Sequence, residues 1–89
     1  MESNELITKD TLERNGFVFV EKYGMMQWME DLRSRNGGFE VCWTEDLNLL
    51  QIRGKGVSLD LFGCSYLQQM QNIMKALGIN KKITLYSQK

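Results

Sequence analysis

The feature that most constrains the fold is a stripe of apolar residues at helical spacing near the C-terminus. Large apolar residues recur there every three or four positions, with polar residues between them. This period is typical of a helix that buries one face. Gly78 then provides a helix stop. The sequence therefore predicts a helix over Ser65–Leu77 that must pack on another layer. Its apolar stripe consists of Tyr66, Leu67, Met70, Ile73, Met74 and Leu77.

Short runs of β-branched, aromatic or alternating residues predict the strands on which this helix packs. In the clearest run, Val57, Leu59 and Leu61 alternate with Ser58 and Asp60, which is the period of a half-buried strand. Turn signals separate the runs. The predicted strands are Phe17–Val20, residues 39–44, Leu47–Arg53, Val57–Phe62 and Ile83–Tyr86.

The segment over residues 25–33 fits two structures. Apolar residues at positions 25, 28, 29 and 32 follow the spacing of a helix, whereas positions 26, 28 and 32 also fit one face of a strand. Asn36-Gly37, which follows, is a hairpin signal when strands flank it. We therefore favour a strand here and keep a helix as the alternative.

A short helix is predicted before the first strand. Thr8 is a favourable N-cap, Asp10 suits the first turn, and Gly16 provides a stop. Leu12 would then face the core. We expect this helix to span Lys9–Asn15.

Together these elements predict an α+β fold in a single domain over residues 1–89, with residues 1–5 and 87–89 frayed. We expect an antiparallel sheet of about five to six short strands, with a short N-terminal helix and one amphipathic C-terminal helix packed on one face. Hydrophobic residues make up 43% of the chain, which suits a globular protein. The other face and the edges of the sheet are left to water or to a partner.

The absence of histidine excludes several kinds of catalytic site. No Ser-His or Cys-His pair can form, and two cysteines without histidine cannot complete a four-ligand zinc site. The acidic pairs Glu30-Asp31 and Glu45-Asp46 lack the spacing of a calcium loop, and Gly54-Lys55-Gly56 lacks that of a P-loop. We therefore expect a protein that is not an enzyme and has no cofactor and no metal.

Cysteine content and the length of the apolar runs favour a soluble cytoplasmic protein. We expect Cys42 and Cys64 to be reduced and buried, with a disulfide as the alternative if their strands are neighbours. Apolar runs such as Phe17–Val20 are far shorter than the roughly 20 residues that cross a bilayer. The acidic, polar start does not have the pattern of a secretory signal.

Two groups of residues are candidate binding surfaces. Methionine adapts to irregular surfaces and tryptophan is enriched at interfaces, so one apolar run is a candidate protein interface, unless its members only fill the core. This run contains Met25, Met26, Trp28 and Met29.

The second group follows from an uneven distribution of charge. Residues 1–50 carry ten acids and five bases, whereas residues 51–89 carry six bases and one acid. The basic half offers a candidate patch for an anion or a nucleic acid, unless folding interleaves the two halves and their charges cancel. The patch would contain Arg53, Lys55, Lys81 and Lys82.

Two stretches of the chain resemble a known family. Residues 6–17 are similar to an opening of the form LTxxxLExNGF, and residues 67–79 to a helix pattern ELQxxlxalGI. The family consists of small uncharacterised proteins of Bacteroidetes-type gut bacteria and their phages or mobile elements. It often has Val-His-Glu-Leu-Gln at the start of the helix, where this chain has Ser65-Tyr66-Leu67-Gln68-Gln69. The resemblance implies a fold and a genomic neighbourhood, not an activity.

These observations favour a small non-catalytic protein-binding or accessory protein of phage or mobile-element origin. Its partner would be another protein or a second copy of itself, and it would not bind a membrane. The alternative is a nucleic-acid-associated protein that uses the basic C-terminal half.

Overall fold

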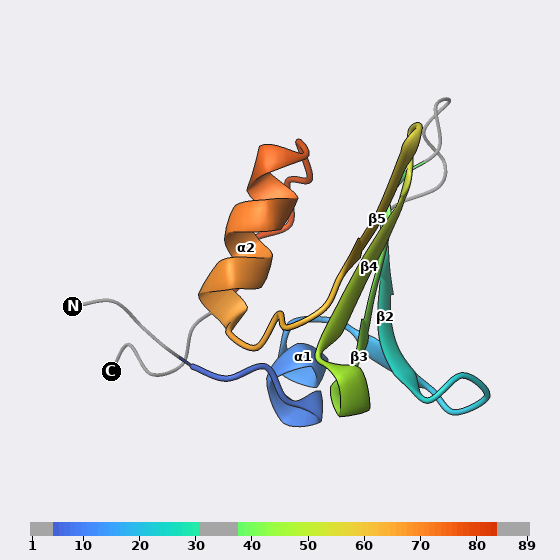
Figure 1. Ribbon diagram of the computed structural model, residues 1–89, viewed down its shortest axis with the longest axis vertical. Coiled ribbons are helices and arrows are strands. Elements are labelled where there is room, and N and C mark those ends of the chain that lie inside the picture. The colour runs from blue at the N-terminus through green and yellow to red at the C-terminus, as the bar shows by residue number, and fades with distance from the viewer. Residues whose placement is uncertain (1–4, 31–37, 84–89) are drawn as a thin grey trace.

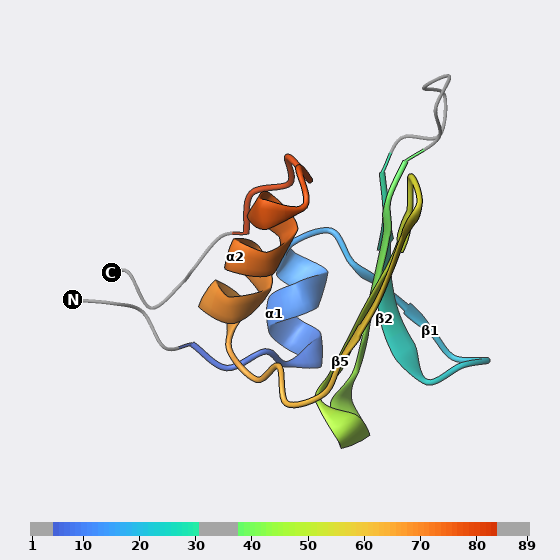
Figure 2. The same ribbon diagram turned by 45° about the horizontal axis from the view of Figure 1, so that its top comes forward.

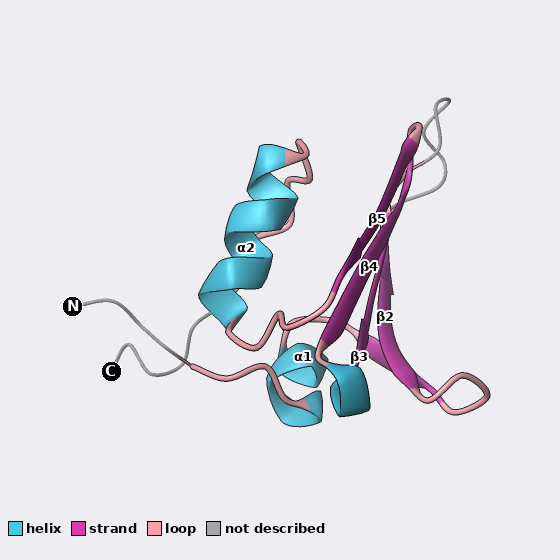
Figure 3. Cartoon of the chain, viewed as in Figure 1, coloured by secondary structure: helices cyan, strands magenta, loops and turns pink. Residues whose placement is uncertain are grey.

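The computed structural model describes residues 5–30 and 38–83, which form two layers (Figure 1). One layer is a five-stranded antiparallel sheet, and both helices lie on the same face of it (Figures 1 and 2). The fold is therefore α+β, as predicted, and Figure 3 shows how helices and strands segregate. In chain order the elements are α1 (Lys9–Arg14), β1 (Val18–Val20), β2 (Met25–Met29), β3 (Glu40–Thr44), η1 (Glu45–Leu47), β4 (Leu49–Gly54), β5 (Val57–Leu61) and α2 (Leu67–Ala76).

The sheet is a meander, because each strand pairs antiparallel with the next one in the chain. The register places Met26 beside Trp43, and Trp43 beside Leu50. All three are buried, so they share the face that carries the helices. The helical alternative is therefore wrong for residues 25–29, which alternate between two faces. Residues 31–33 and the Asn36-Gly37 signal lie outside the described residues.

Some predicted strand boundaries are wrong by one or two residues. The strand predicted from Leu47 begins at Leu49, because residues 45–47 form the 3-10 helix η1 and Asn48 ends it in a left-handed conformation with φ 47°. Asparagine tolerates this conformation better than most residues. Phe17 and Phe62 lie just outside β1 and β5.

The last predicted strand is not formed at Ile83, and residues 84–86 lie outside the described part of the chain. Residues 79–83 instead return along α2, where Gln71 holds them. Its side-chain amide donates to the carbonyl oxygen of Lys81 at 3.1 Å and accepts the Ile83 N–H at 2.6 Å. The Ile83 amide is therefore bonded to a side chain and not to a neighbouring strand.

Helix α1 begins as predicted and ends one residue earlier. Thr8 is its N-cap, and its hydroxyl oxygen accepts the Thr11 N–H at 3.1 Å. The Thr11 hydroxyl oxygen accepts the Thr8 N–H at 2.8 Å, which completes a capping box. Gly16 follows with φ +88°, and Leu12 is fully buried.

Helix α2 spans Leu67–Ala76 and is shorter than predicted. Leu67, Met70 and Met74 are fully buried against the sheet, which confirms the apolar stripe. Tyr66 is the exception, because it is extended at the N-cap, forms a bridge with Leu6 and is 40% exposed. The core between the layers also contains Ile7, Phe17, Met26, Phe39, Val41, Trp43, Leu50, Ile52, Cys64, Ile79 and Ile83.

Gly54, at the end of β4, lies against the backbone of the segment that leads into β3. A Cβ atom on Gly54 would lie 2.5 Å from the carbonyl oxygen of Gly38 and 2.9 Å from the Cα of Phe39. Its φ of +135° is also one that other residues rarely adopt. Glycine therefore permits the close approach of the two segments at this end of the sheet.

Replacing Gly54 by alanine is expected to lower the free energy of unfolding by about 3 kcal/mol. The added methyl group would clash with the backbone of Gly38 and Phe39, and alanine would be strained at this φ. Gly56→Ala is the matched control. Gly56 also has a positive φ, +82°, but has open space around it, so the expected loss is about 1 kcal/mol. Urea titration measures both values, and equal losses would contradict this account.

Candidate functional site

The face of the sheet opposite the helices is open in the part of the chain that the structure describes (Figures 1 and 2). Residues that neighbour the core residues along each strand point to this face. Val18 is 66% exposed and Met29 is 47% exposed. An exposed apolar surface of this kind is typical of interaction sites. The apolar strand residues on the open face are Val18, Val20, Met25, Met29 and Leu49.

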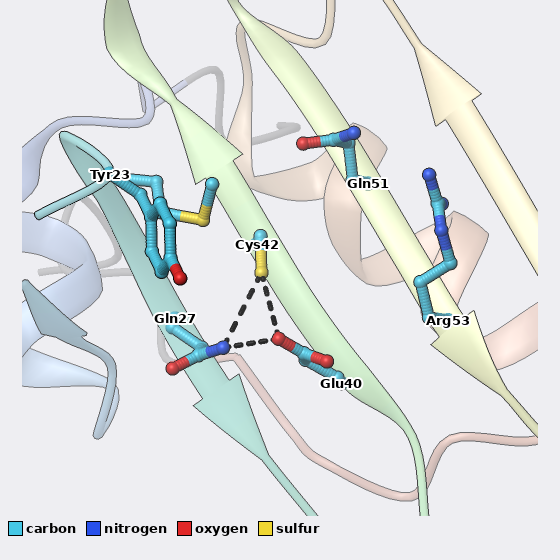
Figure 4. A pocket seen from close by; sticks show the side chains of 7 residues that line it. Tyr23, Gln27, Glu40, Cys42, Gln51 and Arg53 are labelled. Carbon is cyan, nitrogen blue, oxygen red and sulfur yellow. Dashed lines mark hydrogen bonds between the residues drawn. The ribbon is translucent and has the colours of Figure 1, made fainter. Parts of the chain in front are cut away.

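A shallow hollow of about 330 Å³ lies on the open face (Figure 4). Strands β2, β3 and β4 form its floor, and the turn between β1 and β2 contributes Tyr23. Met25 also lines it. The other residues that line the hollow are Gln27, Glu40, Cys42, Gln51 and Arg53.

Gln27, Glu40 and Cys42 form a hydrogen-bonded triangle in this hollow (Figure 4). The side-chain amide of Gln27 donates to Glu40 Oε2 and to Cys42 Sγ, and the Cys42 thiol donates to the same carboxylate oxygen at 3.6 Å. Burial, and after it the negative charge of Glu40, raise the pKa of the Cys42 thiol to about 11. Cys42 is therefore held as a thiol, which is a poor nucleophile.

Arg53 is directed towards β5. Its Nη2 forms a salt bridge with Asp60 Oδ1 at 2.7 Å, and its Nη1 donates to the carbonyl oxygen of Leu59 at 2.9 Å. Hydrogen bonds from Arg53 and Gln51 lower the pKa of the Asp60 carboxyl. Glu40 is the register partner of Arg53 on β3, yet the salt bridge of Arg53 goes to Asp60.

The structure divides the predicted interface run between the two faces of the sheet. Met26 is in the core, and Trp28 is partly buried against the core, with its ring centroid 6.5 Å from that of Phe17. Met25 and Met29 point to the open face. Only two of the four residues therefore lie together on an accessible surface.

The four predicted cations do not form one patch. Arg53 lines the open-face hollow, and the ammonium of Lys55 lies 5.4 Å from the centroid of the Phe39 ring. Lys81 and Lys82 follow α2, in the helical layer on the other side of the sheet. The ammonium of Lys81 lies 5.5 Å from the centroid of the Trp28 ring, and burial lowers the pKa of Lys81.

A second hollow, of about 390 Å³, lies on the helical side of the molecule. Lys81 and Lys82 line it together with Lys75 and polar residues of α2. The structure thus brings two of the four predicted cations, Lys81 and Lys82, together with Lys75, a residue outside the predicted patch.

Sequence reasoning missed Tyr23, Gln27, Glu40 and Gln51 as site residues. The sequence did contain a signal for Glu40. It alternates with the apolar residues Phe39 and Val41, which face the core, so Glu40 must point to the opposite face of the sheet. The remaining neighbours depend on the register between strands. That register places Gln27 beside Cys42, and Cys42 beside Gln51.

Cys42 and Cys64 lie on opposite sides of the sheet. Cys42 lines the open-face hollow, whereas Cys64 belongs to the core. Both are buried, as predicted, and the disulfide alternative is wrong, because the two cysteines are not neighbours.

Within residues 5–30 and 38–83, no cluster of three metal-ligating side chains is present. None of the helices in these ranges is long and apolar enough to cross a membrane. Comparison of the chain with protein-family models, curated proteins and solved structures gave no significant match. The resemblance to the Bacteroidetes and phage family therefore stays a prediction.

Both thiols are expected to react slowly with iodoacetamide at pH 8, because a pKa of about 11 leaves about one molecule in a thousand as thiolate. Glu40→Gln is expected to accelerate alkylation of Cys42 several-fold, since it removes a negative charge beside the sulfur. Cys64 is the internal control, because its pKa is raised by burial alone. Mass spectrometry of the labelled peptides gives both rates. An unchanged Cys42 rate would contradict the assigned role of Glu40.

Proposed function

We propose that this chain is a small non-catalytic binding protein that engages a protein partner through the open face of its sheet. The observation that carries this proposal is the one-sided core. Both helices cover one face of the sheet, and the opposite face presents apolar side chains around a polar hollow. A sheet face of this composition is suited to bury against another protein.

The chemistry of the hollow favours binding over catalysis. Its nucleophilic side chain, Cys42, is held as a thiol by burial and by Glu40. Its guanidinium, on Arg53, is already engaged by Asp60. Gln27, Glu40 and Cys42 are hydrogen-bonded to one another, and Gln51 and Arg53 are bonded to Asp60. Such preorganised polar groups give an apolar surface its specificity.

We also propose that the protein is bacterial, of phage or mobile-element origin, and cytoplasmic. The family resemblance of residues 6–17 and 67–79 supports a bacterial protein of phage or mobile-element origin. The two buried free cysteines support a reducing compartment such as the cytoplasm.

Photo-crosslinking tests the proposed face. A benzophenone amino acid at position 25 lies on the open face, and the same amino acid at position 72 lies on the exposed side of α2 as a control. In nuclease-treated cells of the source organism, position 25 is expected to yield a discrete protein adduct that position 72 does not. An adduct of twice the chain's mass would identify a second copy as the partner.

Competition shows whether the adduct depends on the apolar surface. Excess unlabelled wild-type protein should abolish the adduct, whereas a Met25→Lys, Leu49→Lys variant with an unchanged thermal unfolding midpoint should not. Equal adducts at positions 25 and 72, or adducts to nucleic acid alone, would overturn the proposal.

A further inference from the structure

The hollow on the open face contains a carboxylate whose charge is not balanced by the described residues. Glu40 Oε2 accepts hydrogen bonds from Gln27 and Cys42, which are uncharged donors. Glu40 Oε1 accepts no hydrogen bond from the described residues. The salt bridges found among the described residues involve the carboxylates of Glu5 and Asp60 and not that of Glu40. An incoming cation would therefore find an oriented carboxylate with an available oxygen atom.

The nearest candidate counter-ion is held away from this carboxylate. Arg53 lies beside Glu40 in the register, but its two terminal nitrogens are engaged by Asp60 and by the carbonyl oxygens of Leu59 and Ile52. Figure 4 shows its side chain extending away from Glu40. Among the described strand residues that point to the open face, Glu40 and Asp60 carry two negative charges and Arg53 carries one positive charge.

The walls of the hollow suit the apolar stem of a basic side chain. Met25 is partly exposed there, and Tyr23 is 62% exposed at its rim. The ammonium of Lys22 lies 5.5 Å from the centroid of the Tyr23 ring, so we assign this ring to packing against the stem and not to holding the charge. The amides of Gln27 and Gln51 complete the lining with polar groups.

We infer that the hollow receives an arginine side chain of the protein partner, with Glu40 as its counter-ion. This inference rests on the proposed function and names the chemistry of the partner. A guanidinium offers several N–H donors in a planar arrangement to one carboxylate, which an ammonium does less well. Its methylene stem would pack on Met25 while the charged end reaches Glu40.

Titration with blocked amino acids tests the inference on the intact chain. Nα-acetyl-arginine methylamide is the probe, the corresponding lysine compound compares the cations, and the norleucine compound supplies an uncharged stem. In ¹H–¹⁵N correlation spectra, the arginine probe is expected to shift the amides of Gln27, Glu40, Cys42 and Gln51 in a saturable manner. It should bind several-fold more tightly than the lysine compound and about tenfold more tightly than the norleucine compound.

Three variants sharpen the result. Glu40→Gln should weaken arginine binding about tenfold, whereas Glu45→Gln, which removes the same charge from the exposed η1, should leave it unchanged. Asp60→Asn keeps Glu40 but frees Arg53 to turn towards it, so it should also weaken binding severalfold. Dispersed spectra of each variant confirm that it is folded.

Equal affinity for arginine and norleucine, or undiminished binding by Glu40→Gln, would overturn the inference. The crosslinking experiment separates this outcome from failure of the proposed function. A protein adduct at position 25 without arginine binding would support the proposed binding face and reject only the inference that the hollow receives an arginine side chain. Loss of both would reject both.

Discussion

The interaction on which the rest of the structure depends is the contact between Trp43 and the segment that leads into α2. Trp43 is on β3, the middle strand, and is 1% exposed. Its indole N–H donates to the carbonyl oxygen of Cys64 at 3.0 Å. A buried indole N–H without a partner would cost about 1–3 kcal/mol, so this bond fixes the side of the sheet on which α2 begins. Leu67, three residues beyond Cys64, is fully buried in the same core.

The open face is a consequence of this arrangement. A chain of 89 residues buries a modest share of its surface, and here both helices are placed on one side. A strand that sends one residue into the core sends its neighbour to the other face, as Leu50 and Leu49 do in β4. The hollow therefore consists of side chains that the core does not use, and hydrogen bonds among Gln27, Glu40 and Cys42 hold these three in place.

Sequence patterns predicted the features that depend on neighbours in the chain. The cap at Thr8 and the apolar stripe of α2 are local, and both are present. The run from Met25 to Met29 could not be resolved locally, because consecutive large apolar residues fit a helix as well as a strand. Pairing with Trp43 decides the matter, since it requires Met26 in the core and places Met25 outside.

The candidate site was harder to predict, because it is assembled across strands. Glu40, Cys42 and Gln27 meet only once β2 and β3 are paired in the observed register. The position of Lys81 depends on the return of the chain along α2, which the Gln71 side chain holds at Lys81 and Ile83. The distribution of charge along the sequence therefore did not show that Arg53 lies on the open face, whereas Lys75, Lys81 and Lys82 lie together on the helical side.

The one-sided core means that the helices pack on one face of the sheet and leave the other open to a partner. Adjacent residues of β4 test it directly through the free energies of unfolding of Leu50→Ala and Leu49→Ala. Leu50 is fully buried, so its truncation is expected to cost about 2–5 kcal/mol. Leu49 is partly exposed on the open face, and its truncation is expected to cost less than about 1 kcal/mol. Comparable losses at the two positions would contradict the claim.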